Sequence, residues 1–186
     1  SSWTVFSGAL LLESQEHRPS QKRKDALEDQ AESPAREAGE ATENASYEAW
    51  HFCDNQADAD ELARLVLEGR KRATAGALWS YEAEEEPLPE PGDYSVITDW
   101  EGHGVCIIQT TGVSVVPFNQ VSPDFAAREG EGDGSLEYWR KVHREAFTRE
   151  LEEVNRTTGS RYSFTEDMPV VCEEFMLIYP HPKDNS

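Results

Sequence analysis

The composition of this chain changes abruptly near residue 46, and that change decides where a fold can form. Residues 13–45 are rich in Glu, Gln, Ala, Ser, Arg and Lys and contain no aromatic residue. Such a segment cannot bury enough apolar surface to offset the entropy lost on ordering, so residues 1–45 are expected to form a disordered tail. Aromatic side chains arrive together in "YEAWHF", residues 47–52. A folded domain is therefore predicted for residues 46–180, with a short C-terminal tail at 181–186.

Two amphipathic helices are predicted within that domain. In "DADELARLVLEG", residues 58–69, apolar residues recur at helical spacing, Asp58 or Asp60 can serve as the N-cap, and Gly69 suits the position just after the helix. A longer helix is predicted to begin after Ser135, which suits an N-cap, because apolar residues then repeat every three and four positions as far as Val154.

Three apolar, β-branched segments predict strands. They are "YSVITD" at 94–99, "VCIIQTTGVSVVPF" at 105–118 and "MPVVCEEFMLIYP" at 168–180, and the turn signal "WEGHG" between the first two indicates a hairpin or meander. Strands combined with two segregated helices indicate an α+β domain. We expect its strands to curl into a small β-barrel flanked by two or more helices.

The overall charge limits the kinds of partner that the chain can bind. Seventeen Lys and Arg residues against 37 Asp and Glu residues give a formal charge of −20, which disfavours broad, non-specific binding of nucleic acid but permits a local basic pocket. The longest apolar run, residues 3–12, is too short to cross a bilayer, so no membrane association is expected. Cys53, Cys106 and Cys172 lack metal-ligand spacing and are predicted to be reduced, buried thiols, which favours the cytoplasm.

The stretch "GRKRAT" is the first candidate for chemistry. Lys71 and Thr74 are three residues apart, so in a regular strand they would point to opposite faces. They can act together if Lys71 lies in a turn released by Gly69 and Thr74 lies just inside a strand. A lysine with a pKa lowered by partial burial near Arg70 and Arg72 could then activate the threonine hydroxyl. An exposed basic loop followed by an ordinary strand threonine is the alternative.

The loop "EGEGDGS" is the second candidate. Its glycines precede a helix, but Glu129, Glu131 and Asp133 would repel a phosphate, and no Gly-Lys-Ser/Thr follows, so a phosphate-binding loop is excluded. A helix N-terminus stabilises carboxylates, and we expect these acids to stay ionised. One of them could pair with a lysine, orient a water molecule or act as a base. The alternative is that they only stabilise the N-terminus of the helix.

No metal site or cofactor is predicted. The segment after Asp54 resembles a calcium loop only superficially, because its sixth position is Ala59 and its twelfth is Leu65. His143 shares a helix face with Trp139 and Phe147 and is interpreted as a core histidine.

With "GRKRAT", "PGD" before a hairpin and "EGEGDGSLEYWRKVH" in this order, the chain resembles the ASCH-domain family, in particular its longer bacterial branch. The resemblance extends from Tyr47 to Tyr179. It implies a PUA-like β-barrel with helices at its mouth and a cleft for RNA or a modified nucleoside. A small bacterial member is an amidohydrolase that deacetylates N4-acetylcytidine with a Lys, a Thr and a Glu. These map onto Lys71, Thr74 and Glu129, with Glu131 as the neighbouring choice.

Three functions are compatible with this resemblance. The first is an amidohydrolase-like enzyme for a modified, acylated nucleoside or related small amide, in which Thr74 attacks the carbonyl, Lys71 takes its proton and Glu129 positions Lys71 or water. The second is a non-catalytic reader of short single-stranded RNA, or a ribonuclease. It would contact phosphates through Arg70, Lys71 and Arg72. It would stack bases on Trp79, Tyr81 or Trp100. The third is an interaction module with an inherited, idle cleft. The sequence does not predict an oligomeric state.

Overall fold

The computed structural model of the chain describes residues 47–53 and 55–180. Five strands and four α-helices make up this part, together with one 3₁₀ turn, η2 (Phe118–Gln120). The strands are β1 (Tyr47–Trp50), β2 (Ala73–Ala77), β3 (Tyr94–Thr98), β4 (Gly104–Pro117) and β5 (Pro169–Tyr179). The helices are α2 (Gln56–Leu67), α3 (Leu78–Glu84), α4 (Pro123–Glu129) and α5 (Leu136–Thr158). The predictions of tails at 1–45 and 181–186 lie outside the described residues.

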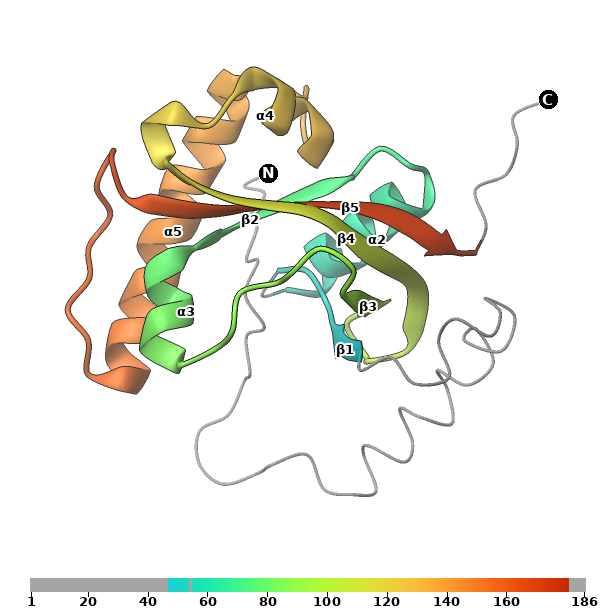
Figure 1. Cartoon of the computed structure of the whole chain (residues 1–186), viewed down its shortest axis with the longest axis horizontal. Coiled ribbons are helices and arrows are strands. Elements are labelled where there is room, and N and C mark those ends of the chain that lie inside the picture. Colours follow the sequence, from blue (N-terminus) through green and yellow to red (C-terminus); the bar gives the residue numbers. More distant parts are fainter. Residues whose placement is uncertain (1–46, 54, 181–186) are drawn as a thin grey trace.

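The five strands form one curled sheet in the order β1-β3-β4-β5-β2. β1 pairs with β3 in parallel, and all other neighbours are antiparallel. The long strand β4 pairs first with β3 and then with β5, and its pairing is shifted near Ile108 and between Thr110 and Gly112. Such irregularities increase local twist and bend a strand, which explains how the sheet curls into a half-barrel (Figure 1). The predicted α+β class and curled, barrel-like sheet are confirmed.

Helix α2 begins earlier than its apolar periodicity indicated. The predicted caps Asp58 and Asp60 are wrong, because the side chain of Asn55 accepts the hydrogen bond from the Asp58 backbone N–H at 3.0 Å. The Asp58 carboxylate accepts a hydrogen bond from the Asn55 side-chain amide at 2.7 Å, which helps to orient the capping side chain. At the other end Gly69 follows the C-cap with φ +71°, as predicted.

Two short helices, α3 and α4, were not predicted. The signals for α4 are present in "SPDFAAREG": Ser122 caps the Phe125 N–H, Pro123 occupies the first turn, and Gly130 closes the helix with φ +69°. Its seven residues are too few to show helical periodicity. The Ser135 cap of α5 is confirmed, since its side chain accepts from the Tyr138 N–H at 3.1 Å.

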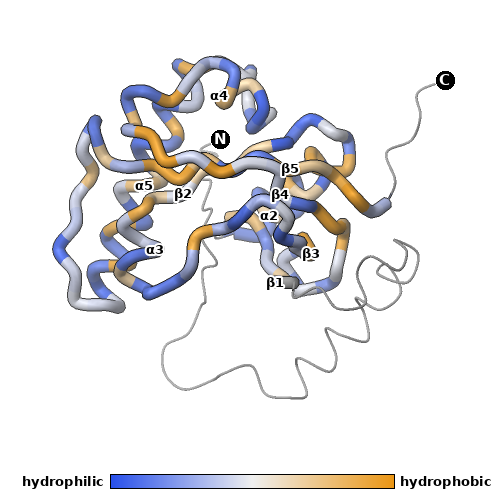
Figure 2. The backbone as a smooth tube through the Cα atoms, in the orientation of Figure 1, coloured by the Kyte–Doolittle hydropathy of each residue, from blue (hydrophilic) through white to orange (hydrophobic). Residues whose placement is uncertain are grey.

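The sheet separates two hydrophobic cores. On one face, α4 and α5 pack against alanines of β2 and apolar residues of β5, with Phe118, Trp139 and Phe147 at the centre. On the inner face of the half-barrel, α2 and Phe52 cover β3, β4 and the end of β5. Figure 2 shows apolar stretches where β2, β4 and β5 meet their neighbours. β2 is an edge strand of the sheet, so one of its two edges is not paired with another strand.

The segment that ends α4 closes the free edge of β2. The Arg72 backbone N–H donates to the Arg128 carbonyl at 2.7 Å, which joins the start of β2 to the end of α4. The next turn lies so close that a Cβ on Gly130 would be 2.1 Å from the Arg70 carbonyl oxygen. Only glycine permits this approach together with the positive φ.

The burial of the three cysteines, Cys53, Cys106 and Cys172, agrees with the sequence prediction. In the described part of the chain, no helix combines the length and the apolar character that a membrane span requires.

A buried carboxyl group lies between α5 and α3. Glu150 is 5% exposed and packs beside Ser80 and the backbone of Ala77. Burial raises the pKa of Glu150 to about 8. The folded protein therefore binds this proton more tightly than the unfolded chain does, and ionisation of Glu150 opposes folding as the pH rises.

We predict that Gly130→Ala destabilises the protein far more than Gly134→Ala. Both residues have positive φ, +69° and +73°, but a Cβ at Gly134 meets nothing closer than 3.9 Å. Gly134→Ala is the control, and its free energy of unfolding should fall by about 1–2 kcal/mol because of the unfavourable φ alone. Gly130→Ala must also displace the backbone, so its free energy of unfolding should fall by at least about 3 kcal/mol. Urea denaturation measures both losses, and equal losses would contradict the close approach.

We predict that Glu150→Gln stabilises the protein at pH 8 but not at pH 5. Stability of the wild type should fall as the pH rises from about 4.5 towards about 8, the range between the ordinary and folded pKa of Glu150. Since each pKa unit corresponds to about 1.4 kcal/mol, the gain at pH 8 should be on the order of 4 kcal/mol. Exposed Glu152→Gln on the same helix is the control. A pH-independent difference in unfolding free energy between wild type and Glu150→Gln would refute the prediction.

Candidate functional site

Lys71 lies in the turn that joins α2 to β2. Gly69 leaves the helix with positive φ, and the N–H groups of Arg70 and Lys71 then both donate to the Leu65 carbonyl, at 2.9 and 3.1 Å. Thr74 is the second residue of β2. Lys71 therefore occupies a turn and Thr74 a strand, which is the arrangement that the three-residue spacing required.

Two glutamates meet Lys71 from the far end of α4. Glu129 is the last residue of α4, and Glu131 follows the Gly130 turn. The Lys71 Nζ atom lies 2.5 Å from Glu131 Oε1 and 3.8 Å from Glu129 Oε2. All three residues are buried, with exposed fractions of 1% for Lys71, 0% for Glu129 and 5% for Glu131. The structure thus brings together the predicted lysine and both candidate glutamates.

His143 is the fourth member of this group, which we call the lysine cluster: Lys71, Glu129, Glu131 and His143. The histidine ring stacks on Trp139, with centroids 4.0 Å apart, and its Nε2 lies 3.3 Å from Glu129 Oε2. Its Nδ1 lies 2.8 Å from the Trp139 carbonyl, which can only accept a hydrogen bond, so Nδ1 carries a proton. The other ring nitrogen, Nε2, therefore faces the Glu129 carboxylate.

The carboxylates fix the protonation state of Lys71. Burial alone would lower the pKa of the Lys71 ammonium, but the charges of Glu131 and Glu129 outweigh it and raise that pKa. Burial would raise the pKa of Glu129, yet Lys71 and His143 hold it below its usual value. For Glu131 burial prevails, and its pKa is raised despite the opposing charge of Lys71. The prediction of a lowered lysine pKa is therefore wrong.

Thr74 faces a different carboxylate. Its side chain is fully buried, and Oγ1 has no hydrogen-bond partner. In the β2–β5 pairing Thr74 lies directly opposite Glu173, so both side chains point to the inner face of the half-barrel. Glu173 is buried and accepts a hydrogen bond from the Thr110 hydroxyl at 2.7 Å. Thr74 thus forms no hydrogen bond with Lys71 or Glu129, the predicted partners.

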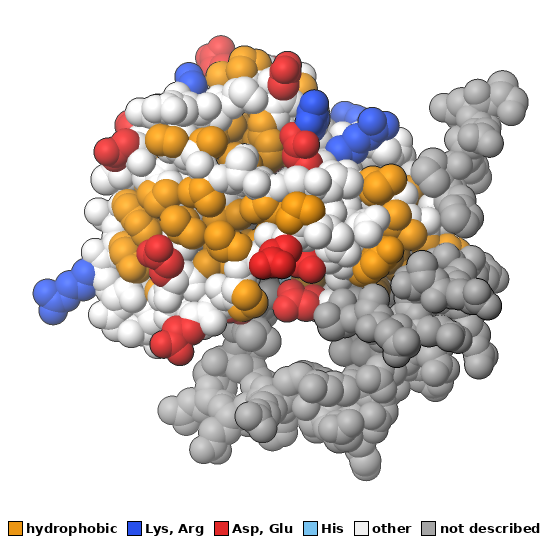
Figure 3. Space-filling view, in the orientation of Figure 1, with side chains coloured by type: hydrophobic (Ala, Val, Ile, Leu, Met, Phe, Trp, Pro, Cys, Tyr) orange, Lys and Arg blue, Asp and Glu red, His pale blue; other side chains and the backbone are white. Residues whose placement is uncertain are grey.

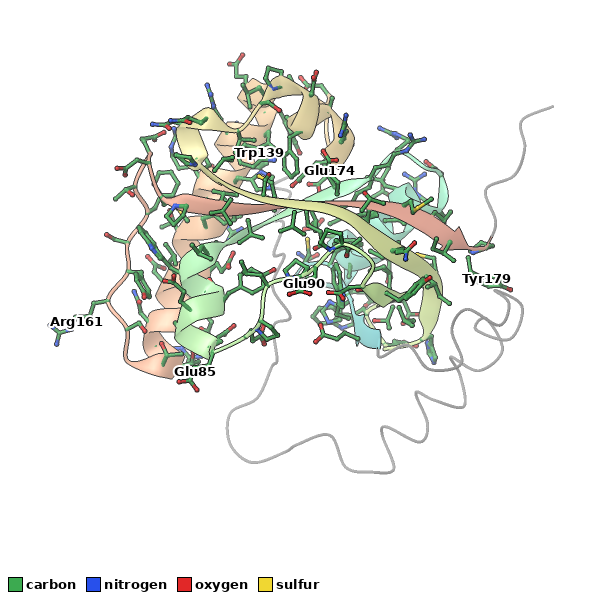
Figure 4. The ribbon with its side chains drawn as sticks, in the orientation of Figure 1. Glu85, Glu90, Trp139, Arg161, Glu174 and Tyr179 are labelled. Atoms are coloured by element: carbon green, nitrogen blue, oxygen red, sulfur yellow. The ribbon has the colours of Figure 1, made fainter. Side chains whose placement is uncertain are left out.

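The next residue on β5 points the other way. Figure 4 shows Glu174 on the α4 side of the sheet, the side on which Trp139 also lies. There Glu174 forms an ion pair with Arg128 of α4. Lys71 lies near both faces, because its ammonium is 5.2 Å from the Phe52 ring centroid in the inner core and also pairs with glutamates from the α4 side.

The predicted RNA-contacting residues are separated by the structure. Arg70 and Arg72 are exposed, and the Arg72 guanidinium donates to the Gly69 carbonyl at 2.8 Å. Lys and Arg side chains gather on the surface around this turn and the end of α4 (Figure 3). Trp79 instead lies on α3, packs against the core between sheet and helices, and stacks on Tyr162 with centroids 5.1 Å apart.

Sequence reasoning missed the roles of His143 and Glu173. His143 is buried, as predicted. Helical periodicity shows which face of the helix carries His143, but it does not show that Glu129 lies opposite that face. "VVCEEF" did contain a signal for Glu173: in a buried strand, two consecutive acids must point to opposite faces, so one of them faces an interior. In the described ranges no group of His, Cys, Asp and Glu side chains has an arrangement that could hold a metal ion.

Comparisons with known proteins agree with this fold. The sequence profile of the ASCH domain matches residues 48–179. An ASCH-domain crystal structure from Lactobacillus crispatus JV V101 is 37% identical, with a TM-score of 0.70, and covers 91% of this chain and 99% of its own chain. A crystal structure of a protein from Enterococcus faecalis V583 is 31% identical, with a TM-score of 0.69, and covers 84% of this chain and 91% of its own. No curated protein sequence matches the chain.

The profile match spans well over half of the chain, and both structural matches agree with the curled sheet and the helices described above. The chain therefore belongs to the ASCH-domain family.

Proposed function

We propose that this ASCH-domain protein is an amidohydrolase-like enzyme that acts on an acylated nucleoside of the N4-acetylcytidine kind or on a related small amide. The observation that carries the proposal is a buried ammonium, Lys71, held by two carboxylates on a turn three residues before Thr74, a buried threonine whose hydroxyl has no hydrogen-bond partner. An unsatisfied buried hydroxyl costs free energy, and such groups are concentrated at functional sites.

Amide hydrolysis needs a nucleophile, a proton acceptor and a group that stabilises the oxyanion. Thr74 supplies a hydroxyl nucleophile. Lys71 cannot accept a proton, because its pKa is raised and it stays an ammonium. A buried ammonium is instead suited to stabilising the negative charge that develops on the carbonyl oxygen. The proton acceptor in this mechanism is therefore a carboxylate.

The carboxylates and the histidine hold the lysine in place. Glu131 and Glu129 face the ammonium from one side, and His143 Nε2 lies 3.3 Å from Glu129 Oε2. Glu131 has a raised pKa and an Oε2 atom without a hydrogen-bond partner, which suits it to bind a water molecule. Because these groups are buried, substrate entry requires the surrounding side chains to shift.

The charge of the protein favours a neutral substrate. A formal charge of −20 and several buried carboxylates repel phosphates, whereas a free nucleoside or a small amide carries no such charge. The proposed substrate class is thus the unphosphorylated nucleoside rather than the nucleotide.

We predict that the full chain hydrolyses N4-acetylcytidine to cytidine and acetate, and that Thr74→Ala lowers kcat/KM by about 100-fold or more, because the nucleophile is lost. Thr111→Ala changes an exposed threonine of β4 and should leave the rate unchanged. Chromatographic detection of cytidine measures the hydrolysis rate of the wild type and of both variants. Equal rates for wild type and Thr74→Ala, or no hydrolysis by the wild type, would refute the proposal.

A second candidate function is binding of short single-stranded RNA, which the exposed Arg70 and Arg72 beside the lysine cluster favour. If these residues bind phosphates, RNA affinity should fall steeply with salt, and the double change Arg70→Glu and Arg72→Glu should abolish binding at low salt. The exposed Arg161→Glu serves as the matched charge control. Fluorescence anisotropy with a labelled oligonucleotide measures the affinity, and binding that neither change affects would exclude this function for the two arginines.

A further inference from the structure

The proposed mechanism needs a carboxylate that accepts the Thr74 proton, and the sheet register offers one. Thr74 on β2 and Glu173 on β5 are directly opposed in an antiparallel pair. Cβ atoms of such pairs are typically about 4.5–5.5 Å apart. A glutamate carboxylate can therefore approach the threonine hydroxyl directly after a small rotation, or through one water molecule. Both residues are buried, with exposed fractions of 0% and 6%.

Glu173 is held in place from the neighbouring strand. The Thr110 hydroxyl of β4 donates to Glu173 Oε1 at 2.7 Å, and Thr110 itself is 2% exposed. A carboxylate with one oxygen fixed in this way keeps its second oxygen for another partner. Burying a hydroxyl and a carboxylate costs free energy, whereas apolar side chains of the same volume would fill the space without that cost. Packing alone therefore does not explain this pair.

The two glutamates of the lysine cluster face Lys71 and His143 rather than Thr74. Glu131 Oε1 lies 2.5 Å from the Lys71 ammonium, and Glu129 Oε2 lies 3.3 Å from His143 Nε2. Both approach from the α4 side, whereas the Thr74 hydroxyl is on the inner face with Glu173. Glu173 is therefore the buried carboxylate whose position matches the nucleophile.

The charges around Glu173 set its proton affinity. Burial raises the pKa of Glu173, the Thr110 hydrogen bond lowers it, Asp93 and Glu48 raise it, and Lys71 lowers it. Tyr81 of α3 also lies within this electrostatic environment. An acid whose pKa is raised towards the working pH is a better proton acceptor than an ordinary surface glutamate.

We propose that Glu173 is a catalytic residue that accepts the Thr74 hydroxyl proton, and that Thr110 is the residue that positions it. This inference rests on the proposed amidohydrolase function. As Thr74 Oγ1 bonds to the carbonyl carbon, its proton passes to Glu173, and the carbonyl π electrons move to the oxygen, beside Lys71. The C–N bond then breaks, and Glu173 returns the proton to the leaving nitrogen, which leaves an acyl-threonine ester. Water attacks the ester, gives its proton to Glu173 and releases the acid, and Glu173 reprotonates Thr74.

The test measures acylation of Thr74 without relying on the nucleoside substrate. The full chain is mixed with p-nitrophenyl acetate, quenched with acid at successive times, and digested, and the peptide containing Thr74 is analysed by mass spectrometry for an acetyl group. We expect acetylation in the wild type, a rate lowered by about 100-fold in Glu173→Gln, and an unchanged rate in Glu174→Gln. Glu174 is the matched control, because it is the adjacent glutamate on β5 and points to the opposite face.

Thr110→Val provides a second variant that keeps the carboxylate. Its acetylation rate should fall by about 10-fold, and the acidic limb of its rate profile should move to higher pH, because the hydrogen bond that favours the ionised carboxylate is lost. A role for Thr110 in packing alone would not move the pH profile. Circular dichroism checks that each variant is folded.

The outcomes separate this inference from the proposed function. Acetylation that depends on Glu173 without hydrolysis of N4-acetylcytidine would support the proton acceptor and refute the substrate. Undiminished acetylation in Glu173→Gln, or no acetylation of Thr74 in the wild type, would overturn the inference. If the Glu173 inference is overturned but Thr74→Ala loses hydrolysis of N4-acetylcytidine, the proposed amidohydrolase function is still supported.

Discussion

A buried ammonium destabilises a small domain unless opposite charge is brought to it, because removing a charge from water costs several kcal/mol. In the described part of this chain Lys71 is the one lysine or arginine that is buried, and its compensation comes from Glu129 and Glu131, about 60 residues away in the sequence. The Gly130 turn, the end of α4 and the entry into β2 must all be in place before the pair can form. One ion pair thus links the local conformation of two segments to the closure of the whole domain.

Lys71 lies at the start of the edge strand β2, and its ammonium contacts residues on both sides of the sheet. Edge strands expose unpaired backbone groups and are usually covered or blunted. Here the end of α4 covers the start of β2 through the hydrogen bond from Arg72 to Arg128. The same contact carries the two glutamates to Lys71. A structural requirement, covering an edge, and a chemical one, assembling ionisable groups, are therefore met by the same few residues.

The distribution of charge separates the surface from the site. The chain carries a formal charge of −20, yet exposed cations gather around the turn that carries Lys71 and the end of α4 (Figure 3). Inside, the lysine cluster places the Lys71 ammonium beside two glutamates, and His143 lies beside Glu129. Glu173 stands apart from this balance, on the other face of the sheet, held by Thr110. The glutamates that hold the Lys71 ammonium are thus different residues from the glutamate that is proposed to accept the Thr74 proton.

The sequence by itself determined the domain, the three main strands, the long helix with its Ser135 cap, the Gly69 helix end and the family motifs, because these depend on local periodicity, capping and composition. It also identified Lys71 and the glutamates as candidates. It did not reveal α3 and α4, which are too short for periodicity to show, or the Asn55 cap.

Only the tertiary structure decided that Lys71 remains protonated, that His143 faces Glu129 and that Thr74 faces Glu173. Proton affinity depends on burial and on charges brought from distant segments, and strand register depends on which strands pair. Neither quantity is encoded in the spacing of residues along one segment.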